Sequence, residues 1–253
     1  MITVKYRGGL GNNMFQRSVA EIFARTKDLY VNDSSAPRQL KEIIRSSNGT
    51  SSLDATFAIN DNLLYGQTNY LKHLFDNNKR LHFDGFFQRS WLYLDHREML
   101  KSFFNLPVDE REMQKDSVAV YIRRGNIAGS IYSTPYEYYD FVMKDHCFSD
   151  PFYIFTDSPN DKDVLRLAEK YDANIISGDC VQDLSYMTRF KRIIGGSSSY
   201  HWWGIFLSSA EEVYLPLHNT GWGFTPDQKP SIDLYLPFVN YVHYSKYIMR
   251  YKC

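Results

Sequence analysis

Val118-Ala-Val-Tyr-Ile-Arg123-Arg124-Gly125-Asn126 is the stretch that decides the fold of this chain. Residues 118–122 form an unbroken apolar run, which is typical of a buried strand, and Gly125 marks the turn that follows. In an open α/β sheet, ligands bind at the carboxyl ends of the strands. A guanidinium binds phosphate oxygens in a bidentate manner and stays charged at any working pH, so Arg123 and Arg124 predict a diphosphate site. Two solvated arginines at a strand end are the ordinary alternative.

Composition narrows the classes of protein to consider. The chain has 253 residues, enough for one large α/β domain or two small ones. Lys+Arg and Asp+Glu both number 29, and this balance argues against a nucleic-acid groove or a polybasic membrane surface. The three cysteines, Cys147, Cys180 and Cys253, are too widely spaced for a disulfide framework or a zinc site. With no signal peptide and no apolar run of about 18 residues, we expect a cytoplasmic protein without a transmembrane segment.

The second half of the chain alternates regularly between strand and helix patterns. A polar segment, Leu106–Lys115, separates it from the first half, so we expect domains at 1–115 and 116–253, with the C-terminal tail packing back on the first half. Such alternation predicts βαβ units and a parallel sheet. The expected strands are 118–122, 152–156, 173–176, 192–194 and 212–215, and the expected helices begin near 136 and span 161–171, 182–190 and 199–207.

The first half opens with a strand, a glycine-rich turn and a helix. The turn, Gly8-Gly9-Leu10-Gly11-Asn12-Asn13, lies between a strand at 2–6 and a helix that runs to Thr26. Glycines permit close backbone approach, and free N–H groups at a helix N-terminus suit an anion or a sugar hydroxyl. The turn lacks the Lys and Ser/Thr of a Walker A loop, and a purely structural turn is the alternative. Further expected elements are strands at 29–31 and 81–87 and a helix at 91–104.

Two more strand ends carry candidate binding residues. Asp157 follows the strand at 152–156, where it either caps the next helix or binds a ribose hydroxyl or base edge. Ser197, Ser198 and Ser199 join the strand at 192–194 to an apolar helix, and they form a second phosphate-compatible site. For His201, in the same helix, we favour a satisfied helix residue over a catalytic role.

Together these motifs resemble glycosyltransferase family 11, the α-1,2-fucosyltransferases, which are related to the α-1,6- and protein O-fucosyltransferases. Five motifs appear in the family's order across about residues 6 to 210. They are Gly8-Gly-Leu-Gly-Asn12-Asn-Met-Phe-Gln16, Gly85-Phe-Phe-Gln88, Tyr121-Ile-Arg-Arg-Gly-Asn126, Tyr153-Ile-Phe-Thr-Asp157 and Ser197-Ser-Ser-Tyr-His-Trp-Trp-Gly204. Each motif is weak alone, but five in order are specific.

The resemblance implies a GT-B-like α/β fold with two Rossmann-like halves facing across a cleft. It implies an inverting enzyme that transfers a sugar from a nucleotide sugar to a glycan hydroxyl without a bound metal, most like an α-1,2-fucosyltransferase that uses GDP-fucose. The donor-binding positions that it implies are Gly9, Gly11, Asn12, Arg123, Arg124, Asn126, Asp157, Ser197, Ser198 and Ser199.

Two positions depart from the family pattern His-x-Arg-Arg-x-Asp. Tyr121 replaces the histidine and Asn126 replaces the aspartate, so a carboxylate role at residue 126 is lost. A related enzyme with another donor, such as UDP-xylose, is one alternative, and a non-catalytic sugar- or nucleotide-binding protein is another. Because an amide is no base, we look for the catalytic base in the first half, where Asp84 precedes Gly85; a turn-forming Asp is the alternative there.

Overall fold

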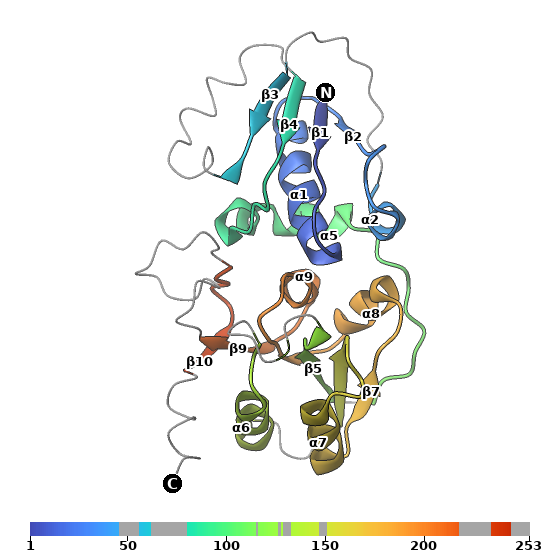
Figure 1. Ribbon diagram of the computed structural model, residues 1–253, viewed down its shortest axis with the longest axis vertical. Helices are drawn as coiled ribbons and strands as arrows, with labels where there is room; N and C mark the ends of the chain where they lie inside the picture. Colours follow the sequence, from blue (N-terminus) through green and yellow to red (C-terminus); the bar gives the residue numbers. More distant parts are fainter. Residues whose placement is uncertain are drawn as a thin grey trace. The chain divides into compact units, whose positions relative to one another are not determined.

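The computed structural model describes residues 1–45, 56–61, 80–114, 116–125, 128, 133–146, 151–217 and 234–243. The chain divides into two compact units, Met1–Asn105 and Leu106–Cys253. Figure 1 shows a sheet with covering helices in each unit. Among the described residues, no helix combines the length and apolar character needed to cross a membrane.

The first unit is built on a parallel four-stranded sheet. Its strand order is β2-β1-β4-β3, and every neighbouring pair is parallel. The strands are β1 (Ile2–Val4), β2 (Val31–Asn32), β3 (Thr56–Ile59) and β4 (Arg80–Phe83). The helices are α1 (Leu10–Thr26), α2 (Arg38–Ile43) and α5 (Arg97–Phe103), with short 3-10 turns at Ser90–Leu92 and Leu94–His96. Helix α1 packs against β1 and β2 and buries Met14, Phe15 and Val19.

The second unit contains a parallel six-stranded sheet in the order β10-β9-β8-β5-β6-β7. Its strands are β5 (Val118–Ile122), β6 (Phe152–Thr156), β7 (Asn174–Ile176), β8 (Arg192–Ile194), β9 (Glu212–Leu217) and β10 (Asn240–His243). Its helices are α6 (Tyr136–His146), α7 (Lys162–Tyr171), α8 (Cys180–Met187) and α9 (Ser199–Leu207). Figure 1 shows α6 and α7 on one side of the sheet and α8 and α9 on the other. All five residues of β5 are buried, as expected for a central parallel strand.

Several expected elements differ in extent. The strand expected at 81–87 is β4, which ends at Phe83, and the helix expected at 91–104 is two 3-10 turns followed by α5. Tyr93 lies at the junction of the two 3-10 turns and points into the core. Its hydroxyl donates to the carbonyls of Phe87 and Phe15. Helix α1 begins at Leu10, so the glycine turn is shorter than expected.

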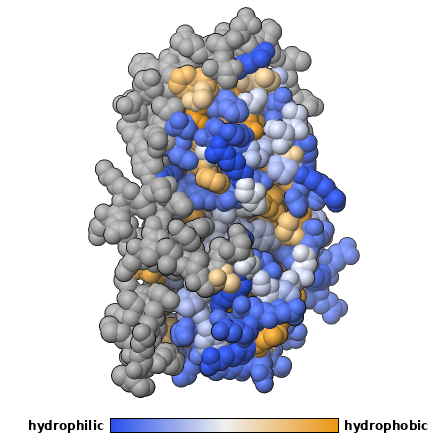
Figure 2. Space-filling model, in the orientation of Figure 1, coloured by the Kyte–Doolittle hydropathy of each residue, from blue (hydrophilic) through white to orange (hydrophobic). Residues whose placement is uncertain are grey.

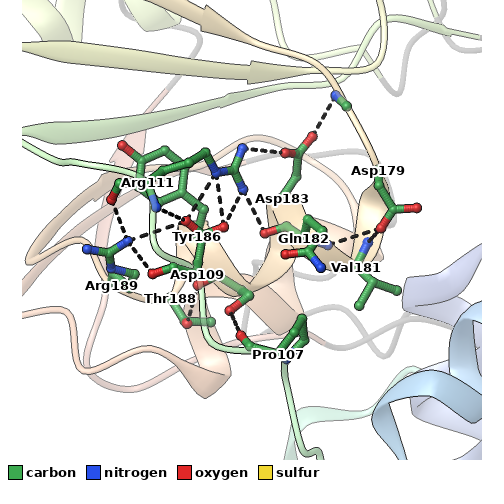
Figure 3. Close-up of polar contacts among 12 residues, drawn as sticks. Pro107, Asp109, Arg111, Asp179, Val181, Gln182, Asp183, Tyr186, Thr188 and Arg189 are labelled. Carbon is green, nitrogen blue, oxygen red and sulfur yellow. Dashed lines mark hydrogen bonds and ion pairs between the residues drawn. The ribbon is translucent and has the colours of Figure 1, made fainter.

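The polar segment 106–114 packs on α8 (Figure 3). Arg111 donates to Asp109 Oδ2 at 2.6 Å and to Asp183 Oδ1 at 2.9 Å, and its guanidinium lies 4.2 Å from the centre of the Tyr186 ring. The Tyr186 hydroxyl donates to the carbonyl of Glu112. We call Asp109, Arg111, Asp183 and Tyr186 the Arg111 clamp. It fixes this segment to the second unit, whereas the sequence pattern placed the segment at the end of the first domain.

The face shown in Figure 2 is a mixture of hydrophilic and hydrophobic residues. Large hydrophobic side chains with high exposure within the described ranges are Phe86, Trp91, Val108, Leu165, Tyr235 and Phe238. The C-terminal tail expected to pack on the first half comprises residues 241–251. Its first three residues belong to β10 and pair with β9 of the second unit, and residues after 243 lie outside the described residues.

Candidate functional site

The strand order of the second unit marks where a ligand binds. From β5 the chain proceeds to β6 and β7 on one side, then crosses to β8, β9 and β10 on the other. The topological switch point therefore lies between β5 and β8, and ligands of open α/β sheets bind at the carboxyl ends of the strands there. Arg123 immediately follows β5, and Gly195, Gly196 and Ser197 follow β8. The fold thus brings the predicted cation, Arg123, and the serine cluster at residues 197–199 to the same end of the second sheet.

Arg123 is the more accessible arginine of the predicted pair. Its side chain is 37% exposed, and its nearest guanidinium nitrogen lies 3.9 Å from Asp157 Oδ2. Asp157 Oδ1 accepts the backbone N–H groups of Arg124 and Gly125 at 2.8 and 3.1 Å. Asp157 therefore organises the turn behind Arg123, while Asp161, and not Asp157, caps α7.

The Arg124 guanidinium is bound within the protein. The residue is 3% exposed, and its side chain donates to the carbonyl of Thr134 at 2.7 Å and to Ser133 Oγ at 3.2 Å. It also lies 3.4 Å from carboxylate oxygens of Asp161 and Asp163. This arginine thus anchors the strand end to the start of α7, so the accessible charge of the pair is that of Arg123.

The turn between β8 and α9 is tightly packed. A Cβ at Gly196 would collide with the hydroxyl of Tyr139, so glycine is required there by space. The backbone N–H of Ser197 donates to Thr134 Oγ1 at 3.0 Å, and Ser198 caps α9 by accepting from the N–H of Tyr200. Ser197 and Ser198 are buried and Ser199 is half-buried, so Ser199 is the most accessible of the three serines.

His201, for which the sequence analysis favoured a helix residue over a catalytic role, is buried beside β5. It is 4% exposed, and its ring lies 5.3 Å from that of Tyr121, two residues before Arg123. Burial, followed by the charge of Arg123, lowers the pKa of His201 to about 3. The imidazole is therefore neutral. The motif Ser197–Gly204 contains His201, but the sequence did not show that its ring lies against Tyr121.

A second switch point occurs in the first unit, between β1 and β4. Asp84 follows β4 there, and its carboxylate forms ion pairs with Arg7 and, at 3.0 Å, with Lys5. The hydrogen bond from Lys5 and the charges of Arg7 and Lys5 lower the pKa of Asp84. The carboxylate is therefore ionised near neutral pH, with a weakened affinity for a proton.

The glycine turn lies at the same edge of the first sheet. Gly9 is the N-cap of α1 without a side-chain capping bond, and Gly11 is buried in the first turn. The Asn12 Oδ1 atom accepts from Gln88 Nε2 at 2.7 Å. Gln16, which the motif contained but the candidate residues omitted, is fully buried; it accepts the N–H of Arg7 and donates to the carbonyl of Gly85. This side chain joins the two strand-end loops.

The loop after Asp84 has an unusual backbone. Phe87 is fully buried at φ +54°, a left-handed conformation that is rare for a bulky residue. Asp61 accepts the N–H groups of Phe86 and Phe87 at 2.9 and 2.7 Å, and the Tyr93 hydroxyl donates to the carbonyl of Phe87. These contacts hold a conformation that the local sequence does not favour.

Asn126 lies outside the described residues. Within the described ranges, no group of three His, Cys, Asp or Glu side chains is arranged to hold a metal ion. Cys180 is a partly buried cysteine at the first position of α8.

Comparison with known proteins supports the resemblance seen in the motifs. No family model matches the chain. An Escherichia coli alpha-1,2-colitosyltransferase is 26% identical over 178 residues, which are 60% of this chain and 59% of that protein. The chain thus matches less than two thirds of this relative's length.

Two solved structures are also similar. The Arabidopsis thaliana FUT1 mutant R284K in complex with GDP matches with a TM-score of 0.56 and 9% identity, covering 85% of this chain and 70% of that chain. NodZ alpha-1,6-fucosyltransferase soaked with GDP-fucose matches with a TM-score of 0.45 and 11% identity, covering 84% of this chain and 93% of that chain. The expected α/β fold of the GT-B type is confirmed by the likeness to FUT1 and by the parallel sheets. This chain is therefore similar to fucosyltransferase-like glycosyltransferases and has their fold.

Proposed function

We propose that this chain is an inverting glycosyltransferase that moves a sugar from a nucleotide sugar to a hydroxyl of a glycan without a metal ion. The observation that carries the proposal is the position of Arg123, an accessible guanidinium directly after β5 at the switch point with β8. A fixed cation at this position suits the diphosphate of a nucleotide sugar. The half-buried Ser199 supplies a hydroxyl donor at the neighbouring strand end.

GDP-fucose is the donor that we propose first. The resemblance to the α-1,2-fucosyltransferases and the GDP in the Arabidopsis structure support a guanosine nucleotide. The colitosyltransferase relative supports transfer through an α-1,2 linkage, with colitose as a second candidate sugar. UDP-xylose remains the alternative because residue 126 is an asparagine.

The proposed chemistry requires a cation where the leaving group gains charge. Glycosyl transfer passes through an oxocarbenium-like transition state as the diphosphate departs. The Arg123 guanidinium stabilises that growing negative charge without a divalent ion, in the manner of an oxyanion-stabilising donor. Arg124 contributes through its contacts with Thr134 and Asp161, which hold the strand end in place.

Inversion requires a single displacement assisted by a base on the acceptor hydroxyl, and we propose Asp84 for this role. Its lowered pKa keeps the carboxylate in the proton-accepting form near neutral pH. The ion pairs with Lys5 and Arg7 weaken it as a base. In an oxocarbenium-like transition state the acceptor hydroxyl loses its proton late, so a weak base is compatible with the step.

A nucleotide panel tests the proposal. A ligand that binds only the folded state stabilises it by RT ln(1 + [L]/Kd), about 2.7 kcal/mol at a hundred times Kd. We expect GDP to raise the melting temperature more than UDP does, and the shift to disappear in Arg123→Ala. Transfer from GDP-fucose should then persist in excess EDTA. Nucleotide binding without release of nucleoside diphosphate would instead indicate a non-catalytic binding protein, and loss of turnover with EDTA would contradict metal independence.

A further inference from the structure

Phe86 presents part of its aromatic ring to solvent two residues after Asp84, the proposed base. The residue is 39% exposed. Single exposed hydrophobic residues are common on protein surfaces, so this exposure alone indicates nothing. Two further observations set Phe86 apart, namely the rigid backbone that carries its ring and the position of that backbone after β4, at the switch point of the first sheet.

The backbone around Phe86 is fixed by side chains from other parts of the first unit. The Asp61 carboxylate accepts the N–H groups of Phe86 and Phe87 at 2.9 and 2.7 Å. A Cβ at Gly85 would lie 2.8 Å from Asp61 Oδ2, so the carboxylate packs directly against the loop. The carbonyl of Gly85 accepts from Gln16 Nε2 at 3.1 Å. All these contacts use main-chain atoms of the loop, and none of them requires a phenylalanine at residue 86.

The two consecutive phenylalanines of this loop have opposite environments. Phe87 is fully buried, and its ring meets that of Phe83 edge to face with the centroids 5.6 Å apart. It adopts a left-handed backbone conformation, which is costly for a bulky residue and is found mostly at binding and catalytic sites. A polar side chain at residue 86 would keep the backbone hydrogen bond to Asp61 without exposing apolar surface. The fold therefore does not explain the Phe86 ring.

The neighbourhood of Phe86 has the chemistry of a sugar site. Two residues of chain span at most about 7 Å, so the Phe86 and Asp84 side chains start close together. The Asp84 side chain is 29% exposed and lies beside the exposed cation of Lys5. A pyranose carries hydroxyl groups around its rim and C–H groups on its faces. An aromatic ring with a negative face attracts the C–H groups, while a carboxylate accepts from a hydroxyl at the rim.

We propose that Phe86 is an acceptor-binding residue, whose ring stacks on a C–H face of the pyranose that carries the attacked hydroxyl. The inference rests on the proposed function, because it takes Asp84 as the base that faces this hydroxyl. It assigns a substrate contact in the first unit to a residue outside the expected donor-binding positions. It also restricts the acceptor to sugars with one ring face free of bulky axial groups.

Substitutions at residue 86 separate stacking from a structural role. Phe86→Leu keeps apolar bulk but lacks an aromatic face, and Phe86→Trp enlarges that face. With GDP-fucose and the methyl β-glycosides of galactose, glucose and mannose, we expect Phe86→Leu to raise the acceptor KM about three- to tenfold with little change in kcat. Phe86→Trp should keep the KM near that of the wild type. A structural role predicts instead that the KM follows the melting temperature across the variants.

Leu165→Ala is the matched control, because Leu165 is 47% exposed on α7 of the second unit. It should leave the acceptor KM unchanged. An unchanged KM in folded Phe86→Leu, or an equal rise in Leu165→Ala, overturns the inference.

A direct test observes the acceptor without turnover, by saturation-transfer difference NMR of the full chain with GDP and each glycoside. In the wild type and in Phe86→Trp, the C–H protons of one ring face should receive the strongest saturation, and Phe86→Leu should lose this preference. Binding with the same proton pattern in Phe86→Leu, or binding of none of the three glycosides, overturns the inference. If GDP does not stabilise the chain before any glycoside is added, the proposed function itself fails, and this separate result takes the inference with it.

Discussion

Asp157 Oδ1 accepts the backbone N–H of Arg124 at 2.8 Å, so the residue after β6 fixes the turn after the neighbouring strand β5. The same carboxylate leaves no space for a Cβ at Gly125, whose φ is +20°. Arg123 directly precedes this turn. Its backbone is therefore held by contacts that do not involve its own guanidinium, and the charge can be removed without disturbing the strand end.

Replacing Arg123 by alanine should reduce transfer without unfolding the protein. Loss of one donor to a developing oxyanion costs about 2.7–4 kcal/mol in the barrier, which corresponds to a hundredfold or greater fall in kcat. Initial rates and melting curves measure the two effects separately. Arg38→Ala is a suitable control, because the Arg38 side chain is 91% exposed and forms a surface ion pair with Glu42. Near-normal turnover in folded Arg123→Ala would exclude the diphosphate role.

Replacing Arg124 by glutamine should chiefly lower stability. The substitution leaves the Thr134 carbonyl and the carboxylates of Asp161 and Asp163 without their cation. Breaking such a buried ion network costs about 2–4 kcal/mol of unfolding free energy. Urea unfolding measures it. If the variant keeps full stability but loses turnover, Arg124 contacts the donor directly, as the sequence motif suggested.

Replacing Asp84 by asparagine should abolish transfer while leaving nucleotide affinity intact. The amide has nearly the same shape as the carboxylate but cannot take up a proton from an acceptor hydroxyl. Calorimetric titration with GDP and a transfer assay provide the two measurements. Loss of both activities would point to a structural role for the pairs with Lys5 and Arg7.

His201 should make the second unit sensitive to acid. Burial lowers its pKa to about 3, whereas in the unfolded chain the group titrates near 6.5. Below about pH 6.5 the unfolded state binds a proton that the folded state refuses, so stability falls as pH decreases towards 3, by up to about 1.4 kcal/mol per pH unit. Urea unfolding from pH 7 to 4.5 should show this slope in the wild type and a shallower one in His201→Asn. Equal slopes would contradict the buried neutral imidazole.

Asp61 should be needed for the conformation of the loop after Asp84. Asp61→Asn retains one acceptor but turns an amide nitrogen towards a backbone N–H of Phe86 or Phe87. We expect a loss of about 1–3 kcal/mol of unfolding free energy, because a backbone N–H loses its charged acceptor. Thermal and urea unfolding measure the change. A fully stable variant would show that Asp61 is not needed to hold Phe87 in its left-handed conformation.

The sequence predicts the second unit more accurately than the first. Strands at 118–122, 152–156 and 192–194 are confirmed residue for residue, because buried parallel strands appear as short apolar runs between turns. In the first unit, β3 follows a Ser- and Asn-rich stretch that hides its four residues, and the 91–104 segment breaks because Tyr93 turns inward to bond Phe87 and Phe15. These differences arise from tertiary structure, which the local hydrophobic periodicity of the sequence does not reveal.

The candidate site was also predicted only in part from the sequence. Motif order indicated which strand ends matter, but two adjacent arginines look equivalent in sequence. Their difference arises from Thr134 and Asp161, which are distant along the chain and capture Arg124 alone. For His201 the sequence favoured a satisfied helix residue, because a helical pattern places it on a buried face without showing that its Nδ1 atom has no hydrogen-bond partner there.

The Arg111 clamp has a practical consequence for dissecting the protein. Asp183 and Tyr186 on α8 receive their guanidinium and carbonyl partners from the segment before β5. A recombinant fragment that starts at residue 116 would lack those partners of α8. The Tyr186 ring and the Asp183 carboxylate would then lose the contacts that cover them. Truncations intended to isolate the second unit should therefore begin at Leu106, ahead of the clamp.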